Sequence, residues 1–302
     1  MTVHQYRDAA SATHVLTLVS DRAAALLTDA MVDRVRNAIG GGVTTVLSPR
    51  EAVDIALNAA PDLAVVRTAL DGAAVDAIAQ PAAGRRKRLL IADMDSTIVT
   101  GETLDELADF AGLKARIAAI TARAMNGELD FKAALRERVA MLKGLPVAAL
   151  EQTWQRVRLT SGARELVATM RANGAMTALV SGGFTFFTGR VAALVGFDLH
   201  RSNVLLDDGE VLSGTVAEPI VDRHAKVATL RELAARDGLG LDAALAVGDG
   251  ANDLDMLGEA GLGVAFHAKP IVAAAAQARV DHADLRALLF AQGYRGREFV
   301  TE

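Results

Sequence analysis

Residues 89–97 read LLIADMDST and decide the fold class of this chain. The first four positions form an apolar run, which is typical of a strand buried on both faces of a parallel sheet. Two carboxylates, Asp93 and Asp95, follow at the end of this strand. Carboxylates in such a place are costly unless they are paired, protonated or bound to a metal ion. The pair therefore indicates a functional site, although an isolated Asp-x-Asp could equally cap the following turn.

Two later apolar runs also end in unusual residues. Residues 178–180 (ALV) lead into Ser181-Gly182-Gly183, and residues 245–247 (LAV) lead into residues 248–253 (GDGAND). A hydroxyl followed by two glycines lets backbone N–H groups approach an anion, and acidic oxygens in a glycine-rich turn suit Mg²⁺. The alternatives are a plain strand-to-helix turn and a solvated turn. Ligands of open α/β sheets bind at strand ends, so we interpret the three strand ends together.

The pattern after residue 88 predicts an α/β fold. We expect strands over 175–180, 243–247 and 262–266, helices over 184–195 and 222–237, and a hairpin with an Asp-Gly turn over 204–212. This alternation favours a doubly wound, Rossmann-like parallel sheet. The mostly helical residues between its first two strands are interpreted as an inserted cap over the strand ends.

The N-terminal third predicts a small α+β domain. We expect strands over 15–19, 43–47 and 63–67, a helix over 23–39, and a second helix starting at the capping-box pattern SPRE of residues 48–51. The resulting β-α-β-α-β order vaguely resembles small regulatory, ACT-like domains, which would mediate dimerisation or feedback by serine.

Domain boundaries follow from composition. The basic run at residues 81–88, PAAGRRKR, is interpreted as a solvated linker in a net-acidic chain. The predicted domains are an N-terminal α+β domain of residues 1–84, a core of residues 85–100 and 160–302, and a helical cap of residues 101–159.

Composition excludes several classes of function. The chain has 302 residues, a formal net charge of −5 and no cysteine. The absence of cysteine excludes disulfides, thiolate zinc sites and cysteine nucleophiles. The mild charge gives no indication of nucleic-acid or membrane binding. The uncharged residues 172–189 contain Asn, Ser and Gly, so we interpret them as a strand, a turn and a helix start. We expect a cytoplasmic protein.

Taken together, the strand-end motifs resemble those of haloacid dehalogenase-like (HAD) phosphatases, and more narrowly the phosphoserine phosphatase family. The matching residues are 93–99 (DMDSTIV) followed by Glu102, 181–184 (SGGF), 248–257 (GDGANDLDML) and 268–270 (AKP). Their order and spacing match over residues 89–290, about two-thirds of the chain. Haloacid dehalogenases lack the second aspartate, so Asp95 favours phosphate chemistry.

The resemblance implies a role for each motif. Asp93 would attack phosphorus and form an aspartyl-phosphate, while Asp95 would act as general acid and then general base. One Mg²⁺ would be held by Asp93, the Asp95 backbone carbonyl and Asp249, with Asp253 supporting its waters or Lys226. The phosphoryl oxygens would be bound by Ser181, the Gly182 N–H, Lys226 and Asn252. Alone, Lys226 would be an ordinary surface lysine.

The inserted helices are expected to choose the substrate. Phe131, Leu135, Arg138 and Leu142 share one face of a helix, and an arginine there could simply extend its head to water. The resemblance instead makes Arg138 the partner of a substrate carboxylate. Glu102 would bind the substrate ammonium, although an acid in a first helical turn also favours the helix dipole. Met125 and Phe131 would close an apolar lid.

The predicted activity is therefore Mg²⁺-dependent hydrolysis of O-phosphoserine, the last step of serine biosynthesis. The alternatives are a related phosphatase or phosphotransferase acting on phosphothreonine, phosphohomoserine or another small phosphomonoester, and a non-catalytic amino-acid sensor. A homodimer is an open option, and nucleic-acid and membrane partners are not expected.

Overall fold

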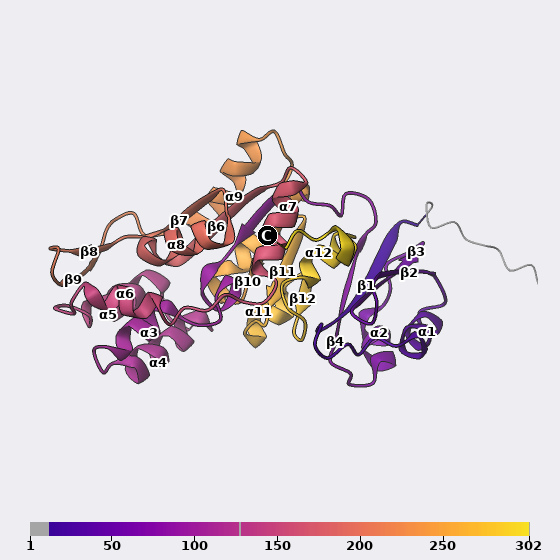
Figure 1. Ribbon diagram of the computed structural model, residues 1–302, viewed down its shortest axis with the longest axis horizontal. Helices are drawn as coiled ribbons and strands as arrows, with labels where there is room; N and C mark the ends of the chain where they lie inside the picture. The colour runs from indigo at the N-terminus through magenta and orange to yellow at the C-terminus, as the bar shows by residue number, and fades with distance from the viewer. Residues whose placement is uncertain (1–11, 127, 302) are drawn as a thin grey trace, which may run out of the picture.

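A six-stranded sheet forms the centre of the computed structural model, which describes residues 12–126 and 128–301 (Figure 1). The strand order is β12-β11-β10-β5-β6-β7, and all neighbouring pairs are parallel. The strands are β5 (Leu89–Ala92), β6 (Met176–Phe184), β7 (Leu199–Asn203), β10 (Ala244–Gly248), β11 (Leu262–Phe266) and β12 (Ala278–Val280). The predicted doubly wound α/β fold is confirmed.

Helices cover both faces of this sheet because its strands are apolar on both sides. In β5, Leu90 and Ala92 pack into one core, whereas Leu89 and Ile91 pack into another. The first core is completed by α7 (Ala163–Ala172), α8 (Thr185–Val195) and α12 (Ala287–Ala291). The second is completed by α9 (Arg223–Arg236), α10 (Leu254–Glu259) and α11 (Pro270–Ala275).

The uncharged residues 172–189 fall into three elements: the end of α7, strand β6 and the start of α8. The predicted strand and helix start are confirmed, whereas the turn predicted between them is absent among these described residues, because β6 continues through residues 181–184 to α8. Within residues 12–126 and 128–301, no helix combines the length and the apolar character needed to cross a membrane.

Four helices inserted after β5 form the cap. They are α3 (Thr103–Asp109), α4 (Lys114–Met125), α5 (Phe131–Ala140) and α6 (Ala148–Trp154). The predicted hairpin, β8 (Leu205–Asp207) and β9 (Leu212–Val216), lies against them at the same end of the molecule (Figure 1). Leu212 donates its N–H to the carbonyl of Leu145 (2.8 Å) and accepts from the N–H of Gly144 (2.9 Å). The hairpin therefore extends the cap with backbone hydrogen bonds.

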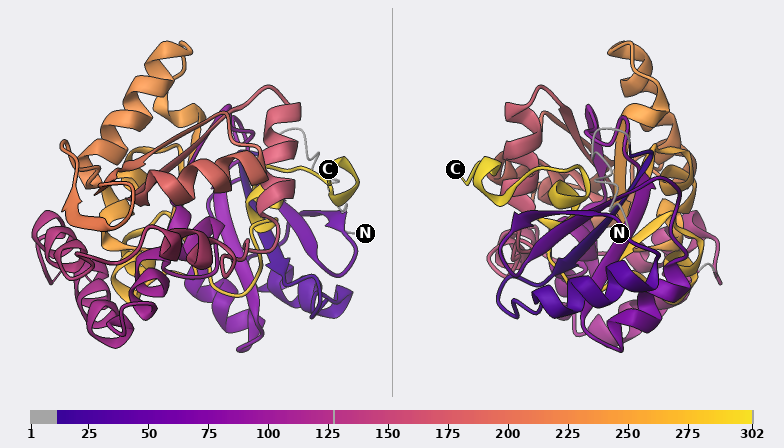
Figure 2. Two further views of the ribbon diagram at one scale, coloured as in Figure 1. Left: turned by 60° about the vertical axis from the view of Figure 1, so that its left-hand side comes forward. Right: turned by 90° about the vertical axis from the view of Figure 1, so that its right-hand side faces the viewer.

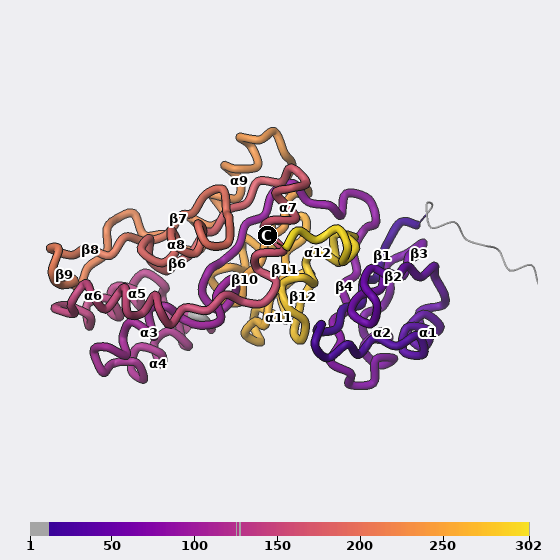
Figure 3. The backbone as a smooth tube through the Cα atoms, in the orientation of Figure 1, coloured from indigo at the N-terminus to yellow at the C-terminus, as the bar shows by residue number. Residues whose placement is uncertain are grey.

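A second, antiparallel sheet lies at the other end of the molecule (Figures 2 and 3). Its order is β2-β3-β1-β4, formed by β1 (His14–Ser20), β2 (Val43–Ser48), β3 (Ala52–Leu57) and β4 (Val75–Pro81). Helices α1 (Asp29–Ala38) and α2 (Leu63–Leu70) cover one face. The other face packs against the apolar residues of α12, so its side chains join the core of the parallel sheet.

The prediction that a helix starts at residues 48–51 was wrong. These residues form a tight turn between β2 and β3, with Arg50 at a φ of 61°. The hydroxyl of Ser48 donates to Glu51 Oε2 (2.7 Å) across the turn instead of capping a helix. Buried Glu51 also pairs with Arg286 of the core at 3.0 Å. The capping-box pattern was satisfied by a different local structure because serine stabilises turns as well as helix starts.

The strand expected over residues 63–67 was also wrong, because these residues begin α2. Asp62 caps this helix by accepting from the N–H of Ala64 (2.8 Å). Only Val66 and Leu70 are buried, a spacing that fits one helical face. The third strand is instead β3, and β4 is a fourth strand that the sequence analysis lacked. The order is thus β-α-β-β-α-β, with both helices on one face of the sheet.

The basic run at residues 81–88 links β4 to β5, and five of its eight residues are exposed, but several of its cations have partners. Arg85 binds the buried carboxylate of Asp54 at 2.6 Å, and Arg86 stacks on the ring of Tyr294. Lys87 is buried, and its ammonium donates to the backbone carbonyl of Asp242 (2.8 Å). Arg85 and Lys87 thus fix the linker to the N-terminal sheet at Asp54 and to the core at Asp242. A buried cation is tolerated there because it has a partner.

Candidate active site

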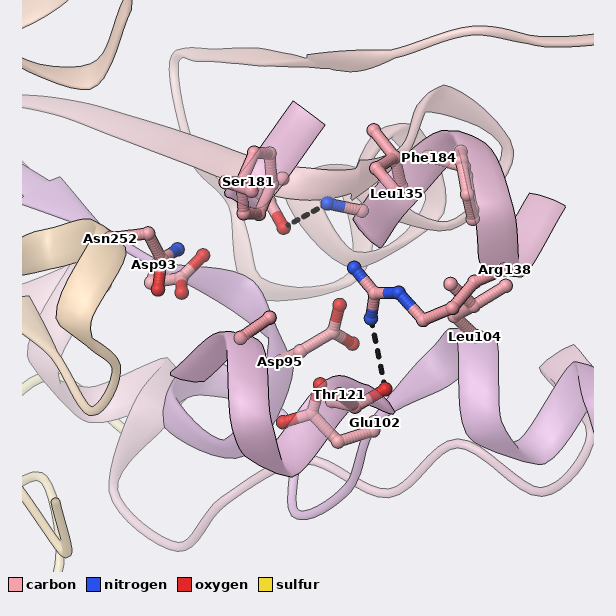
Figure 4. A pocket seen from close by; sticks show the side chains of 14 residues that line it. Asp93, Asp95, Glu102, Leu104, Thr121, Leu135, Arg138, Ser181, Phe184 and Asn252 are labelled. Atoms are coloured by element: carbon pink, nitrogen blue, oxygen red, sulfur yellow. Dashed lines mark hydrogen bonds between the residues drawn. The ribbon is translucent and has the colours of Figure 1, made fainter. Parts of the chain in front are cut away.

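The carboxyl ends of β5, β6 and β10 meet beneath the cap and form a cavity (Figure 4). Side chains from the core form one wall and side chains from α3, α4 and α5 form the other. The lining residues are Asp93, Asp95, Glu102, Leu104, Thr121, Ala124, Phe131, Leu135, Arg138, Ser181, Gly182, Gly183, Phe184 and Asn252. The motifs that the sequence placed at three strand ends therefore surround one space.

Asp93 stands where the chain leaves β5. Its N–H donates to the carbonyl of Val247 in β10 (3.0 Å), which continues the pairing of the two strands by one residue. Its buried carboxylate accepts at Oδ1 from the N–H of Met94 (2.8 Å), and the same oxygen lies 2.9 Å from Lys226 Nζ. The carboxylate is thus held in one orientation at the edge of the cavity.

Lys226 is a fully buried cation beneath Asp93. Helix α9 places its ammonium 2.6 Å from Asp253 Oδ1 and 2.9 Å from Asp93 Oδ1. Burial alone would lower the pKa of Lys226, but the carboxylates of Asp253 and Asp93 outweigh it and raise the pKa above its ordinary value. The ammonium therefore stays charged at every physiological pH.

Asp93 is also one of three carboxylates that lie close together. One oxygen each of Asp93, Asp249 and Asp253 lies within 4.8 Å of the others. Burial raises the pKa of Asp249 well above its usual range, and Glu102 and the two other aspartates raise it further. Burial likewise raises the pKa of Asp253, to about 6, and Asp93 contributes to the shift.

The chemistry of this donor set fits a divalent cation. Both carboxylate oxygens of Asp249 are buried, and neither has a hydrogen-bond partner within the described residues. The nearest cation, Lys269 Nζ, is 3.8 Å from Asp249 Oδ2. Hard cations such as Mg²⁺ take carboxylate and carbonyl oxygens as ligands, and buried polar atoms without partners require such an explanation. These residues are therefore a candidate metal site.

Asp95 and Glu102 face the cavity from the segment that enters the cap. Ser96, at a φ of 54°, turns the chain sharply between them. Asp95 accepts from the N–H (3.0 Å) and the hydroxyl (3.3 Å) of Thr103, and Glu102 accepts from the Ser96 hydroxyl (2.6 Å). Burial raises the pKa of both carboxyls, and the charge of Glu102 raises that of Asp95 further.

The Ser181-Gly182-Gly183 segment lies in the last part of β6, directly before α8. The buried Ser181 hydroxyl accepts from the N–H of Gly183 (2.9 Å). A Cβ on Gly182 would lie 2.6 Å from the Phe131 ring, so only glycine lets the cap approach this closely. The amide of buried Asn203 donates a hydrogen bond to the Gly182 carbonyl (2.8 Å), which restrains this segment.

Arg138 reaches the cavity from α5 in the cap. Its side chain is only 6% exposed, so the alternative of a head extended to water is wrong. One guanidinium nitrogen donates to the Thr121 hydroxyl (2.9 Å), and Nε donates to the Ala134 carbonyl (3.2 Å). The rest of the fork faces the space between Asp95 and Ser181 (Figure 4).

The structure brings the predicted site residues together. Those that line the cavity are Asp93, Asp95, Glu102, Phe131, Arg138, Ser181, Gly182 and Asn252. Lys226, Asp249 and Asp253 contact or adjoin Asp93 from below. Helix α4 ends at Met125, whose side chain lies outside the described residues.

Three residues near the site were not found from the sequence. Thr121 and Asn203 hold Arg138 and Gly182, but each is far along the chain from its partner and belongs to no motif. Lys269 belongs to the Ala-Lys-Pro motif of residues 268–270, which offered a signal but no role. Contacts of this kind require the fold itself.

Comparisons with known proteins agree with this geometry. The sequence model of the haloacid dehalogenase-like hydrolase family matches residues 90–258, more than half of the chain. The phosphoserine phosphatase of Archaeoglobus fulgidus is 42% identical over 213 residues, which cover 70% of this chain and 62% of that protein. This chain therefore spans about three-fifths of the length of this relative.

Two solved structures extend the comparison. A phospho-aspartyl intermediate analogue of phosphoserine phosphatase is 39% identical, with a TM-score of 0.65, over 68% of this chain and 98% of that chain. A probable phosphoserine phosphatase from Vibrio cholerae, in unliganded form, is 31% identical, with a TM-score of 0.77, over 97% of this chain and 90% of that chain. The second match includes the N-terminal sheet. The chain belongs to the haloacid dehalogenase-like hydrolases and, among them, to the phosphoserine phosphatase family.

Proposed function

We propose that this protein hydrolyses O-phosphoserine to serine and phosphate through an aspartyl-phosphate on Asp93. One observation carries the proposal: a single cavity is lined by Asp93, Glu102 and Arg138. In this proposal Asp93 would meet the phosphate, Glu102 the ammonium and Arg138 the carboxylate. A substrate with all three charges has a partner for each. The phosphoserine phosphatases among its relatives, and the solved phospho-aspartyl analogue, support the same substrate and intermediate.

Asp93 is the proposed nucleophile. Both contacts described for its carboxylate fall on Oδ1, so we assign Oδ2 to the attack on phosphorus. The new Oδ2–P bond forms as the bond from phosphorus to the serine oxygen breaks, and Asp95 gives its proton to that oxygen. Asp95 then takes a proton from the water that attacks phosphorus, and the bond to Asp93 breaks.

The phosphoryl group is held by the core. Ser181, the Gly182 N–H and Asn252 line the cavity, and Lys226 lies against Asp93. A fixed ammonium and fixed N–H groups stabilise charge on the phosphoryl oxygens without reorganising during the reaction. Asn203 holds the Gly182 carbonyl and thereby restrains the residue whose N–H makes this contact.

The candidate metal site completes this proposal. Asp93, Asp249 and the backbone carbonyl of Asp95 would hold one Mg²⁺, with Asp253 supporting its waters or Lys226. When bound, the ion supplies positive charge that offsets repulsion between the attacking carboxylate and the phosphate. The unpartnered oxygens of Asp249 support this assignment.

The cap would select the rest of the substrate. Glu102 would bind the ammonium, and Arg138 would bind the carboxylate with its free N–H groups. Phe131 and Met125 would close the apolar side, and the ring of Phe131 already lies against Gly182. Phosphothreonine and phosphohomoserine carry the same charges, so steady-state assays on these substrates decide how strictly the cap selects serine.

The wider setting also belongs to the proposal. We infer domains of residues 1–84, 85–100 with 160–302, and 101–159, and a cytoplasmic enzyme that completes serine synthesis. The N-terminal sheet, with both helices on one face, fits an ACT-like regulatory domain that forms a homodimer or responds to serine. Light scattering and serine inhibition of the full chain test this part.

The central test compares the protein with its Asp93→Asn variant in Mg²⁺-dependent phosphate release from O-phosphoserine. Because an amide is a poor nucleophile, we expect turnover to fall by at least about 10³-fold. Asp54→Asn, at a buried aspartate of the N-terminal sheet, is the control and should retain turnover. Retained turnover in the Asp93 variant would overturn the proposed mechanism.

A further inference from the structure

A buried hydrogen-bond chain joins three helices of the cap. Arg138 of α5 donates to the Thr121 hydroxyl of α4 (2.9 Å), and this hydroxyl donates to Asp105 Oδ1 of α3 (2.7 Å). The three side chains are 6%, 4% and 8% exposed, respectively. Each of the three helices therefore contributes one member, and the chain ends at a residue that lines the cavity.

The direction of this chain follows from the single proton of the Thr121 hydroxyl. That proton has two acceptors, Asp105 Oδ1 at 2.7 Å and the Ile117 carbonyl at 3.1 Å. The carboxylate contact is shorter and charged, so it is the stronger bond. The hydroxyl oxygen is then turned toward Arg138 as an acceptor, and the hydrogen bonds strengthen one another in the buried interior.

Asp105 thereby acts on Arg138 through a neutral group. Burial lowers the pKa of Arg138, and among the charges that oppose this effect Asp105 comes first, ahead of Glu102 and Asp95. A carboxylate in direct contact would compete with a substrate carboxylate for the same N–H groups. The Thr121 hydroxyl occupies Nη1 and fixes the plane of the fork together with the Ala134 carbonyl at Nε, which leaves Nη2 for the substrate.

We propose that Thr121 and Asp105 are positioning residues that orient Arg138 for the substrate carboxylate. The inference rests on the proposed function, because it assumes that Arg138 meets a carboxylate. It adds residues to which neither the motifs nor the comparisons assign a role. A contact to the substrate carboxylate is the same in the ground state and the transition state, so its loss raises KM and leaves kcat unchanged.

The experiment measures KM and kcat of the full chain for O-phosphoserine and for O-phosphoethanolamine, which lacks the carboxylate. Thr121→Val leaves a buried guanidinium N–H without its acceptor, so we expect KM for phosphoserine to rise about tenfold. KM for phosphoethanolamine and both kcat values should stay within about twofold. Thr121→Ser restores the hydroxyl and should restore KM.

Two further variants separate positioning from cap stability. Thr153→Val removes another buried hydroxyl of the cap, in α6, which donates only to its own helix at Ala149 (2.8 Å). It should leave KM for both substrates unchanged. Asp105→Asn keeps an oxygen that can accept from Thr121 and removes only the charge, so its KM should lie between those of the protein and Thr121→Val.

The outcomes distinguish this inference from the proposed function. If the unmodified protein does not prefer phosphoserine over phosphoethanolamine, the proposed substrate is wrong. If it has that preference and Thr121→Val keeps it, only the positioning role is wrong. Equal increases in KM for both substrates would also overturn the positioning role, because they would indicate a general loss of cap structure.

Discussion

Two groups of charged residues at the cavity are held in different ways. We call Asp93, Lys226, Asp249 and Asp253 the floor, and Glu102 and Arg138 the rim. On the floor, Lys226 lies directly between the carboxylates of Asp93 and Asp253, with contacts of 2.9 and 2.6 Å. On the rim, Glu102 accepts from the Ser96 hydroxyl, and the Arg138 fork donates to the Thr121 hydroxyl and to the Ala134 backbone carbonyl. The floor is thus built from ion pairs, and the rim is built from charges held by neutral groups.

The difference reflects what each charge must do. In the proposed function, the floor charges would face a phosphate and a metal ion that are the same for every phosphomonoester, so direct pairs can be fixed once. The rim charges would each accept a group of one particular substrate. A hydroxyl orients such a charge without neutralising it, so its ion pair can form with the substrate instead. The comparison predicts that floor variants lose chemistry, whereas rim variants lose recognition.

The largest effect is expected on the floor, in Lys226→Met. Removal of one partner from a buried ionic group leaves uncompensated carboxylates and costs about 3–5 kcal/mol of stability. Loss of the ammonium beside Asp93 should also lower kcat by at least about 10³-fold for phosphoserine and phosphoethanolamine alike. Urea unfolding in EDTA measures the first quantity, and steady-state assays with Mg²⁺ measure the second.

A matched control exists at the opposite end of β5. Lys87 is also buried, and its ammonium donates to a backbone carbonyl outside the cavity. Lys87→Met should lower stability and leave kcat of the folded protein unchanged. Comparable kcat losses in both variants would show that turnover depends on any buried lysine, and the assignment of the floor would be wrong.

The next effect is expected at the rim, in Glu102→Gln. The amide is similar in shape but lacks the charge that meets the substrate ammonium, so KM for phosphoserine should rise by about 10–100-fold. For 3-phosphooxypropanoate, a substrate without the ammonium, KM should stay unchanged or fall. Glu106→Gln, at a neighbouring glutamate of α3 that pairs with Lys114, is the control. A fall in kcat equal for both substrates would place Glu102 among the floor charges.

The floor was predicted from sequence far better than the rest of the molecule. Asp93 and Asp249 directly follow β5 and β10, and Ser181 follows the apolar run within β6, so a local pattern states both the element and the residue near its end. Parallel pairing of β5 with β6 and β10 then brings those ends together. Sequence reasoning works here because a residue's position at the end of a parallel strand also determines its position at one edge of the sheet.

The hydrogen-bond chain from Arg138 to Asp105 and the N-terminal sheet show where this reasoning fails. Thr121 and Asp105 belong to different helices, so only the packing of the cap reveals that they meet Arg138. Residues 48–51 and 63–67 carried patterns that suit two structures, and tertiary pairing chose between them. Strand β3 is selected by its pairing with β1 and β2, which no local pattern contains.

The smallest of these effects is expected where floor and rim touch, in Gly182→Ala. The added Cβ would lie 2.6 Å from the tip of the Phe131 ring, so the ring, the Ser181-Gly182-Gly183 segment or the cap must shift. Because small misplacements at a reacting centre are costly, we expect kcat/KM for phosphoserine to fall about tenfold. Gly258→Ala is the control, since a Cβ there meets nothing within 4 Å.

The double variant Gly182→Ala/Phe131→Leu decides which side of the contact yields. Leucine is shorter than phenylalanine, so it leaves room for the new methyl group and lets the cap return to its position. If steric pressure on the cap is the cause, the double variant should recover at least half of the lost kcat/KM relative to Phe131→Leu alone. If the loss of kcat/KM in the double variant is the product of the two single losses, the methyl group disturbs the Ser181-Gly182-Gly183 segment itself. The boundary between floor and rim then lies at Ser181.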